Sequence, residues 1–351
     1  MAHRWDERYG SRDEDRKLLT ARQTDSVDAN LAYLKGRYFW NKRTPKELEQ
    51  SLEYFRKAID LDPTYSSAYT GMADAYALLV WQEQLPREDF IARSKAAANK
   101  ALEIDPTLAE PHASLGYVKF WYDWDFAGAE SEFRRAIQLN SRYGTAHHWY
   151  GEALGLMGRF DEGVRELRLA EEVDPLSAII HADLGKLLFL GRQPDQAIEQ
   201  LQKTLELDPH LPLAHVFLAL AWNNKGLHDR AIAELEKIAK AAGSRAIFKA
   251  TLGFVYGQSG HEAEARNVLD ELISLRSTNQ YVSPFHIALV YVGLSENDKA
   301  IEWLRTAQRE RDPFLVYIGV DPNFDTLRAD PRFIDLKTQI GATPAADVSA
   351  E

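Results

Sequence analysis

The sequence repeats itself with a period close to 34 residues. A triplet of one apolar residue, Asp and Pro recurs at 61–63, 104–106, 173–175 and 207–209, and LNS takes its place at 139–141. The last two prolines of the series are 34 residues apart. A fixed period of this length indicates an array of similar units, each too small to bury its apolar surface without its neighbours. This period constrains the fold more than any other feature.

A second pattern of small residues indicates two helices in each period. A small residue follows a large one in successive units at Gly116, Gly151, Gly185, Ala219 and Gly253. Twelve or thirteen residues later comes another small residue, at Ala129, Gly163, Ala197, Ala231 and Ala265. Small side chains let two helix axes approach closely, so we expect each unit to be a pair of antiparallel helices that cross at these positions.

The turns between the two helices of a unit carry their own signals. Glycines at 158, 226 and 260 fall where the first helix must end, and we expect them to adopt positive φ. Aspartates at 161, 195 and 229 stand two residues before the small residue of the second helix, and we expect them to cap it.

These positions resemble the tetratricopeptide repeat, a family of 34-residue helix pairs with a large residue before Gly or Ala in the first helix, Ala in the second and Pro at the close. The resemblance implies an all-α fold, a right-handed superhelical solenoid of about eight helix-turn-helix repeats. We expect a polar segment at 1–28, partly helical or disordered, a C-terminal cap at 314–340 and a flexible tail at 341–351. The expected units are about 29–63, 66–106, 109–141, 144–175, 178–209, 212–243, 246–277 and 281–313. A longer turn is expected at 81–89, where the period is stretched.

Composition limits the classes of function. Lys and Arg total 42 and Asp and Glu total 53, a net charge of −11, which argues against general binding to nucleic acid or to an anionic membrane. The absence of cysteine excludes disulfides and thiolate chemistry. No apolar run is long enough to span a bilayer and no signal peptide is visible, so the sequence predicts a soluble, cytoplasmic protein that binds neither membrane nor nucleic acid directly.

The stretch FWYDWDF at 120–126 concentrates four aromatic rings. The period places Phe120 and Trp121 at the end of a first helix, Asp123 to Asp125 in the turn, and Phe126 at the start of the second helix. We expect Trp124 and Phe126 to fill this helix corner as packing, because rings placed by a repeat pattern are usually buried.

A narrower resemblance covers residues 28–160, including YLKGRYFWNKRTPKELEQSLEYF and WDFAGAESEFRRAIQLNSRYGTAHHWYGEAL. These segments are similar to the repeat region of bacterial regulators in which a winged-helix DNA-binding domain, a protein kinase or a nucleotide cyclase domain precedes the repeats. No segment of this sequence resembles such a domain. The resemblance therefore implies a regulatory context and assigns neither DNA binding nor catalysis to this chain.

The family resemblance also implies a binding surface, because the first helices of such an array line its inner side. We call the residues at the ligand-contacting positions the inner stripe; they are Tyr117, Phe120, Trp121, His148, Glu152, Lys186, Phe189, Leu190, Val216, Leu220, Asn223, Phe254, Phe285 and Leu289. The stripe is mostly apolar. The fifth position of the repeat, where chaperone-tail receptors of the family use lysine to clamp a terminal carboxylate, holds no lysine here; it is occupied by Ala113, His148, Ala182, Val216 and Ala250. It favours a protein or peptide segment with apolar side chains as partner. Two alternatives stay open: the stripe is covered by the chain's own side chains, or the chain associates with itself as a homo-oligomer without a separate ligand.

No pattern indicates catalysis, a cofactor or a metal site. Histidines at 112, 147, 181 and 215 recur once per unit, but neighbouring units lie about 10 Å apart, too far to share an ion with bonds near 2 Å. We interpret them as packed between helices with one nitrogen hydrogen-bonded. His148 and Glu152, four residues apart, are interpreted as a solvated or locally paired surface group. Phosphate-binding and zinc-protease motifs are absent from the sequence.

Overall fold

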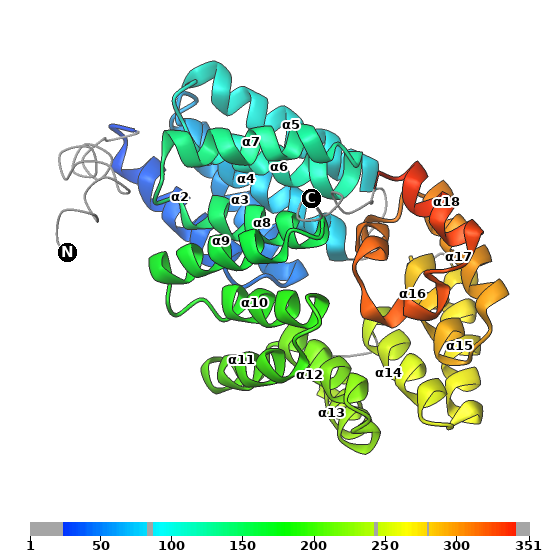
Figure 1. The fold of residues 1–351 in the computed structure, drawn as a ribbon. Coiled ribbons are helices and arrows are strands. Elements are labelled where there is room, and N and C mark those ends of the chain that lie inside the picture. Colours follow the sequence, from blue (N-terminus) through cyan, green and yellow to red (C-terminus); the bar gives the residue numbers. More distant parts are fainter. Residues whose placement is uncertain (1–23, 83–86, 242–244, 279–280, 342–351) are drawn as a thin grey trace, which may run out of the picture. The chain divides into compact units, whose positions relative to one another are not determined.

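The computed structural model describes residues 24–82, 87–241, 245–278 and 281–341 (Figure 1). The expectations for residues 1–23 and for the tail from 342 onward fall outside this part, as does the middle of the lengthened turn at 81–89. Within the described residues every regular element is helical, which confirms the all-α prediction.

The helices follow one another as antiparallel pairs joined by short turns (Figure 1). The pairs are α2 (Val27–Trp40) with α3 (Pro45–Leu61), α4 (Ser66–Leu79) with α5 (Arg87–Ile104), α6 (Glu110–Val118) with α7 (Phe126–Leu139), α8 (Gly144–Leu156) with α9 (Phe160–Val173), α10 (Ala178–Leu190) with α11 (Pro194–Leu207), α12 (Pro212–Asn224) with α13 (His228–Ala241), α14 (Ala246–Gln258) with α15 (Glu262–Ser277), and α16 (Pro284–Gly293) with α17 (Asn297–Arg309). Short helical turns η2 (Val80–Gln82) and η3 (Lys119–Asp123) extend α4 and α6. The chain continues through η4 (Pro313–Gly319), η5 (Pro322–Leu327) and α18 (Pro331–Gln339).

The chain divides into two compact units, Met1–Trp149 and Tyr150–Glu351, and the boundary falls inside α8. Inside each unit the first helix of a repeat contacts the first helix of the next, as α2 does with α4 and α10 does with α12. The second helix of a repeat also contacts the first helix of the next repeat, as α11 does with α12. Each unit is therefore a row of stacked helix pairs, in which the first helices form one continuous side.

The periodic glycines lie where the two helices of a pair cross. A Cβ atom at Gly185 would sit 2.5 Å from Cγ of Leu201, and one at Gly116 would sit 2.9 Å from the ring of Phe133. Leu201 and Phe133 are each four residues after the small residue of the second helix, one turn along the same face. The close crossing confirms the prediction from the small-residue pattern, because no larger residue fits at either glycine without a shift of the facing side chain.

The turns confirm one prediction and overturn another. Gly158, Gly226 and Gly260 have φ of 82°, 75° and 83°, the left-handed conformation that was expected. The predicted capping role of Asp161, Asp195 and Asp229 is wrong, because each lies second in its helix. The N-cap residues of α9 and α11 are Arg159 and Gln193, neither of which makes a side-chain cap hydrogen bond. The aspartates act instead as negative charges in the first turn, where the helix dipole favours them.

The aromatic stretch forms the predicted corner between α6 and α7. After Val118 the chain makes a π-helical turn, and Trp124 then takes φ of 57° before Asp125 caps α7 by accepting a 2.9 Å hydrogen bond from the Gly128 amide. The rings of Phe120 and Phe126 meet edge to face at 5.1 Å. Phe120 is buried and Phe126 is half-buried. The rings therefore serve as packing at a widened turn.

The segment after α17 packs onto the last repeat. Asp312 caps η4 by accepting from the Phe314 amide at 3.1 Å, and it also accepts from the Ser283 hydroxyl at the start of α16 at 2.5 Å. Leu315, Val316 and Ile318 of η4 are fully buried or nearly so. Helix α18 lies against α17 (Figure 1). Among the described residues, no helix is both long and apolar enough to cross a bilayer.

Candidate functional site

Every residue of the inner stripe is buried in this structure. Each exposes less than a tenth of its surface, the least exposed being Phe120 and Leu190 at 1% and the most exposed Glu152 at 8%. Tyr117, Phe120, Trp121 and His148 belong to the first unit and the other ten residues to the second. This burial agrees with the alternative in which the chain's own side chains cover the stripe, and the alternative of self-association stays a prediction. The partner-binding role of the stripe stays a prediction.

In the first unit the inner stripe packs against the turn that follows α4. Trp81 of η2 donates its indole N–H to the Tyr117 hydroxyl at 2.6 Å, and its ring meets Trp121 edge to face at 4.9 Å. Tyr117 in turn lies 4.6 Å from Trp149, measured between ring centroids. Trp81 stands in the stretch where the 34-residue period is broken. The insertion that lengthens this turn thus supplies the aromatic cover.

In the second unit the inner stripe contains a buried ionic cluster. The Lys186 ammonium on α10 donates to Oε1 of Glu152 on α8 at 2.5 Å and to Oδ1 of Asp183 at 2.6 Å. All three side chains are less than a tenth exposed. Burial alone would lower the pKa of Lys186, but the carboxylates of Asp183 and Glu152 raise it well above its ordinary value, so the lysine stays charged.

Asp183 was missed in the sequence analysis, although a signal for it exists. Helix α10 reads AIIHADLGKLLFL, and its only charged residues are Asp183 and Lys186. Opposite charges three residues apart lie on the same face of a helix. A helix that is apolar nearly all round is typical of a buried element, and charges inside such an element are expected to be paired. The pattern therefore indicates an internal ion pair.

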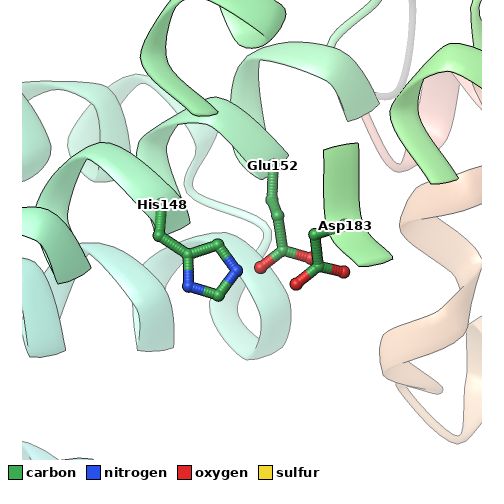
Figure 2. A group of neighbouring side chains, drawn as sticks. All are labelled: His148, Glu152 and Asp183. Carbon is green, nitrogen blue, oxygen red and sulfur yellow. The ribbon is translucent and has the colours of Figure 1, made fainter. Parts of the chain in front are cut away.

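The same cluster overturns the interpretation of His148 and Glu152 as a surface group, because both side chains are buried. Figure 2 shows these two residues one turn apart on α8, with Asp183 of α10 beside Glu152. An imidazole and two carboxylates are donors that a divalent cation accepts. In this structure the Lys186 ammonium already bonds both carboxylates, so the chain's own cation holds that position.

A segment from the C-terminal region reaches this cluster. The hydroxyl of Tyr317 in η4 shares a hydrogen bond with Lys186, and burial raises the pKa of Tyr317 above its ordinary value. The same segment surrounds Phe285 of α16: ring centroids lie 4.9 Å away at Phe324, 6.4 Å at Phe314 and 6.5 Å at Tyr317. Residues 313–327, which we call the C-terminal segment, thus contact the inner stripe in both the fifth and the eighth repeat.

Polar contacts fix the course of the C-terminal segment. Arg192 in the turn after α10 forms a 2.7 Å ion pair with Asp325. Arg328 donates to the carbonyl oxygens of Gly319 at 2.8 Å and Asp321 at 3.1 Å. The Asp321 carboxylate is buried, which raises its pKa to about 6. The sequence had given this segment only the role of a cap, because it lies outside the repeat period.

The recurring histidines are structural, which confirms the packing interpretation. Nε2 of His147, His181 and His215 lies 2.9–3.0 Å from the carbonyl oxygen of the residue six positions earlier, in the turn between repeats. His112 instead pairs through Nδ1 with Glu132 at 2.7 Å. His147, His181 and His215 therefore join a first helix to the end of the preceding repeat, whereas His112 pairs with the second helix of its own repeat.

Comparison with known proteins agrees with the repeat architecture. Family models described as tetratricopeptide repeat match residues 30–65, 155–212 and 183–246. The transcriptional regulator HilA of Salmonella typhimurium is 22% identical over 156 residues, which cover 44% of this chain and 28% of HilA. The type IV pilus assembly protein PilF of Pseudomonas aeruginosa is 34% identical over 80 residues, 23% of this chain and 31% of PilF. The chain therefore matches under a third of the length of either relative.

Among solved structures, the Cut9–Hcn1 hetero-tetramer of the APC/C aligns with a TM-score of 0.58 at 18% identity, over 93% of this chain and 58% of the other. This likeness shows the fold alone. The matched residues carry tetratricopeptide repeats, and the periodic helix pairs extend the same all-α repeat architecture through the described part of the chain.

Proposed function

We propose that the chain is a non-catalytic scaffold for protein–protein interactions that binds a partner segment with apolar side chains along the inner stripe. Tetratricopeptide repeat proteins mediate interactions between proteins, which gives the general class. The observation that carries the finer proposal is that Lys186 and Phe285, three repeats apart, already hold one short stretch of polypeptide, the C-terminal segment. The contacts of the C-terminal segment indicate which side chains a partner needs in order to bind to the inner stripe.

The chemistry of these contacts defines the expected partner. Phe285 is surrounded by the rings of Phe314, Tyr317 and Phe324, and such ring pairs contribute about 0.5–1.5 kcal/mol beyond their buried area. Lys186 offers a hydrogen bond to a hydroxyl at the edge of this aromatic cluster. A partner segment with two or three aromatic residues and one hydroxyl or carbonyl near Lys186 would satisfy both features.

Such a partner competes with the chain's own segment. Phe314 and Tyr317 are half-buried, whereas Leu315, Val316 and Ile318 between and beside them are buried in the core. Replacement of the two half-buried rings by rings of a partner therefore leaves the core of η4 in place. The apparent affinity of the wild-type chain is reduced by the fraction of time that its own rings occupy the site.

A catalytic role has no comparable support. The buried carboxylates of Glu152 and Asp183 at the inner stripe are both already hydrogen-bonded to Lys186. A carboxylate held in this way is a poor general base, because proton uptake would break its ion pair.

A labelled peptide tests the proposal. A fluorescein-labelled peptide of residues 312–328 is titrated with the full-length chain and with the full-length Phe314→Ala, Tyr317→Ala double variant, and its anisotropy is measured. We expect the double variant to bind about 10-fold tighter or more, because its own rings no longer compete. Ile334→Ala, an exposed apolar residue on α18, is the matched control and should bind as the wild type does.

The peptide itself supplies the specificity control. A second peptide in which the residues corresponding to Phe314, Tyr317 and Phe324 are serine should bind about 10-fold more weakly or worse, because the ring contacts are lost. Equal binding of the two peptides, or no binding to the folded double variant, would contradict the proposal. Circular dichroism checks that the variant is folded.

We further propose that this scaffold works as a regulatory module in a bacterial signalling or transcription system. The support is the similarity to HilA over 156 residues, together with the regulator-like segments in residues 28–160. Transcript profiles of a strain lacking the gene, compared with the same strain carrying the wild-type gene or the Phe314→Ala, Tyr317→Ala variant, test this proposal. Profiles that agree in all three strains would contradict it.

A further inference from the structure

Helix α2 exposes an apolar stripe that no described part of the chain covers. Val27, Leu31, Leu34 and Tyr38 are 76%, 51%, 54% and 59% exposed. The opposite face of the same helix, with Ala29, Ala32, Gly36 and Trp40, is buried against the first unit. The four exposed residues are spaced by four, three and four positions, so they form one continuous line along the helix. We call this line the α2 stripe.

The position of α2 in the array explains why the stripe is uncovered. In other repeats the second helix of the preceding repeat contacts the first helix, as α3 does with α4 and α5 does with α6. Helix α2 is the first described helix and therefore has no such neighbour among the described residues. An exposed apolar line of this length at the end of a repeat array lowers the solubility of the protein unless another surface packs against it.

We propose that the α2 stripe is the contact surface between two copies of this chain, packed as an antiparallel pair of α2 helices about a two-fold axis. The 4-3-4 spacing is the a/d spacing of a helical coiled coil. In the antiparallel pairing Leu31 of one copy faces Leu34 of its partner, and Val27 faces Tyr38. Because the contact is two-fold symmetric, each pairing occurs twice, and all four side chains of each copy are covered by the other copy.

The charges beside the stripe fit the same arrangement. Asp28 and Lys35 lie on the same flank of the α2 stripe, seven residues apart, and both are exposed. In an antiparallel pair this flank of one helix meets the same flank of the other, so Asp28 faces Lys35 of the second copy and Lys35 faces its Asp28. In a parallel pair the flanking positions would bring different residues together, and these two opposite charges would not meet.

The size of the contact predicts a reversible dimer. Stable interfaces bury about 1,200–2,000 Å² in total, and a contact of four side chains from each of two helices lies at or below the low end of that range. We therefore expect a dimer that dissociates on dilution, and whose formation does not involve the inner stripe.

Sedimentation velocity of the full-length chain tests the proposal. The wild type is expected to pass from monomer to dimer between about 1 and 200 μM. Leu31→Glu with Leu34→Glu should remain monomeric throughout this range, because each copy of the variant would bring two carboxylates to the centre of the contact. Leu176→Glu is the matched control, since Leu176 is 79% exposed in the turn between α9 and α10, and it should dimerise as the wild type does.

A charge swap tests the orientation. Asp28→Lys places two pairs of like charges in the contact and should weaken dimerisation about 10-fold or more. The double variant Asp28→Lys, Lys35→Asp restores both pairs of opposite charges, and its dimer affinity should return to within about 3-fold of the wild type. A wild type that is monomeric at the highest concentration would overturn the proposal. A dimer unaffected by Leu31→Glu with Leu34→Glu, or a swap without recovery, would overturn it as well.

Discussion

The Lys186 ammonium lies 2.5 Å from Oε1 of Glu152, the residue one full period of 34 positions before it. The two residues occupy equivalent places in the fourth and fifth repeats, so this ion pair joins neighbouring repeats through the inner stripe. Asp183 supplies the second carboxylate from the helix that carries Lys186. The cluster therefore links two repeats to each other and, through Tyr317, to the C-terminal segment.

Lys186→Met is expected to lower the free energy of unfolding by about 3–5 kcal/mol, because it leaves two buried carboxylates without their cation. Adding Glu152→Gln and Asp183→Asn to Lys186→Met should recover part of the loss, since the uncompensated charges are then gone. Urea denaturation followed by circular dichroism measures both. Lys203→Met is the control: Lys203 pairs with Glu199 on the surface, where the two side chains are 62% and 69% exposed, and its loss should cost less than about 1 kcal/mol.

Gly185→Ala is expected to destabilise the chain by about 1–3 kcal/mol, because its new Cβ would lie 2.5 Å from Cγ of Leu201. Leu201→Ala removes the atoms that the new Cβ would meet. In that background the same glycine substitution should cost much less, which a double-mutant cycle of unfolding free energies measures. Equal costs in both backgrounds would mean that the two residues do not meet at the crossing.

The fold could be predicted from the sequence because its physical cause is periodic. Gly116 and Gly185 must be small for the helices to cross, and that requirement returns in each unit at the same spacing. The capping residues could not be predicted in this way. An aspartate is favoured both at the N-cap and in the first turn, so Asp161 and Asp195 satisfy the pattern although they lie inside their helices.

The burial of the inner stripe could not be derived from the repeats. Helix α10 is apolar around nearly its whole circumference, so its sequence does not tell which face meets solvent. Part of the cover in the second unit comes from residues 313–327, which lie outside the period and carry no repeat signal. In the first unit it comes from Trp81, in the stretch where the period is broken. Segments that lie outside the repeat pattern thus determine how far the inner stripe is exposed to solvent.

Asp321→Asn is expected to stabilise the chain at neutral pH. Burial raises the folded-state pKa of Asp321 to about 6, above the ordinary value of about 3.9. The protonated form is thus favoured in the fold, and the stability that it contributes is fully present below the ordinary pKa and is lost as the pH rises toward 6. Asparagine can still accept the 2.9 Å hydrogen bond from the Asn323 amide.

The gain for Asp321→Asn should therefore be on the order of 1–3 kcal/mol at pH 7 and shrink to about zero near pH 4. Urea denaturation at pH 4, 5.5 and 7 measures this difference between variant and wild type. A variant that is less stable than the wild type at pH 7 would show that the ionised carboxylate is favoured in the fold.

Ser295→Gly is expected to raise the free energy of unfolding by about 0.5–1 kcal/mol, because Ser295 is exposed and holds φ of 60°, where a side chain is strained. Other repeats have glycine at the corresponding turn. The reverse change, Gly226→Ala, places a side chain at φ of 75° with open space around it, so backbone strain is its main cost and a loss of about 1 kcal/mol is expected. Thermal melts of both variants measure the two effects, and shifts in the same direction would contradict this account.

Amide hydrogen exchange measures most directly whether the inner stripe binds polypeptide in the place of the C-terminal segment. The full-length chain is compared with and without an isotope-labelled peptide of residues 312–328, whose fragments differ in mass from those of the chain. Exchange in residues 313–327 of the chain is expected to become faster when the peptide is added, because the peptide takes over the contacts of Phe314 and Tyr317 with Phe285 and Lys186. Exchange there that stays unchanged while the peptide is bound would place binding elsewhere and contradict the proposed site.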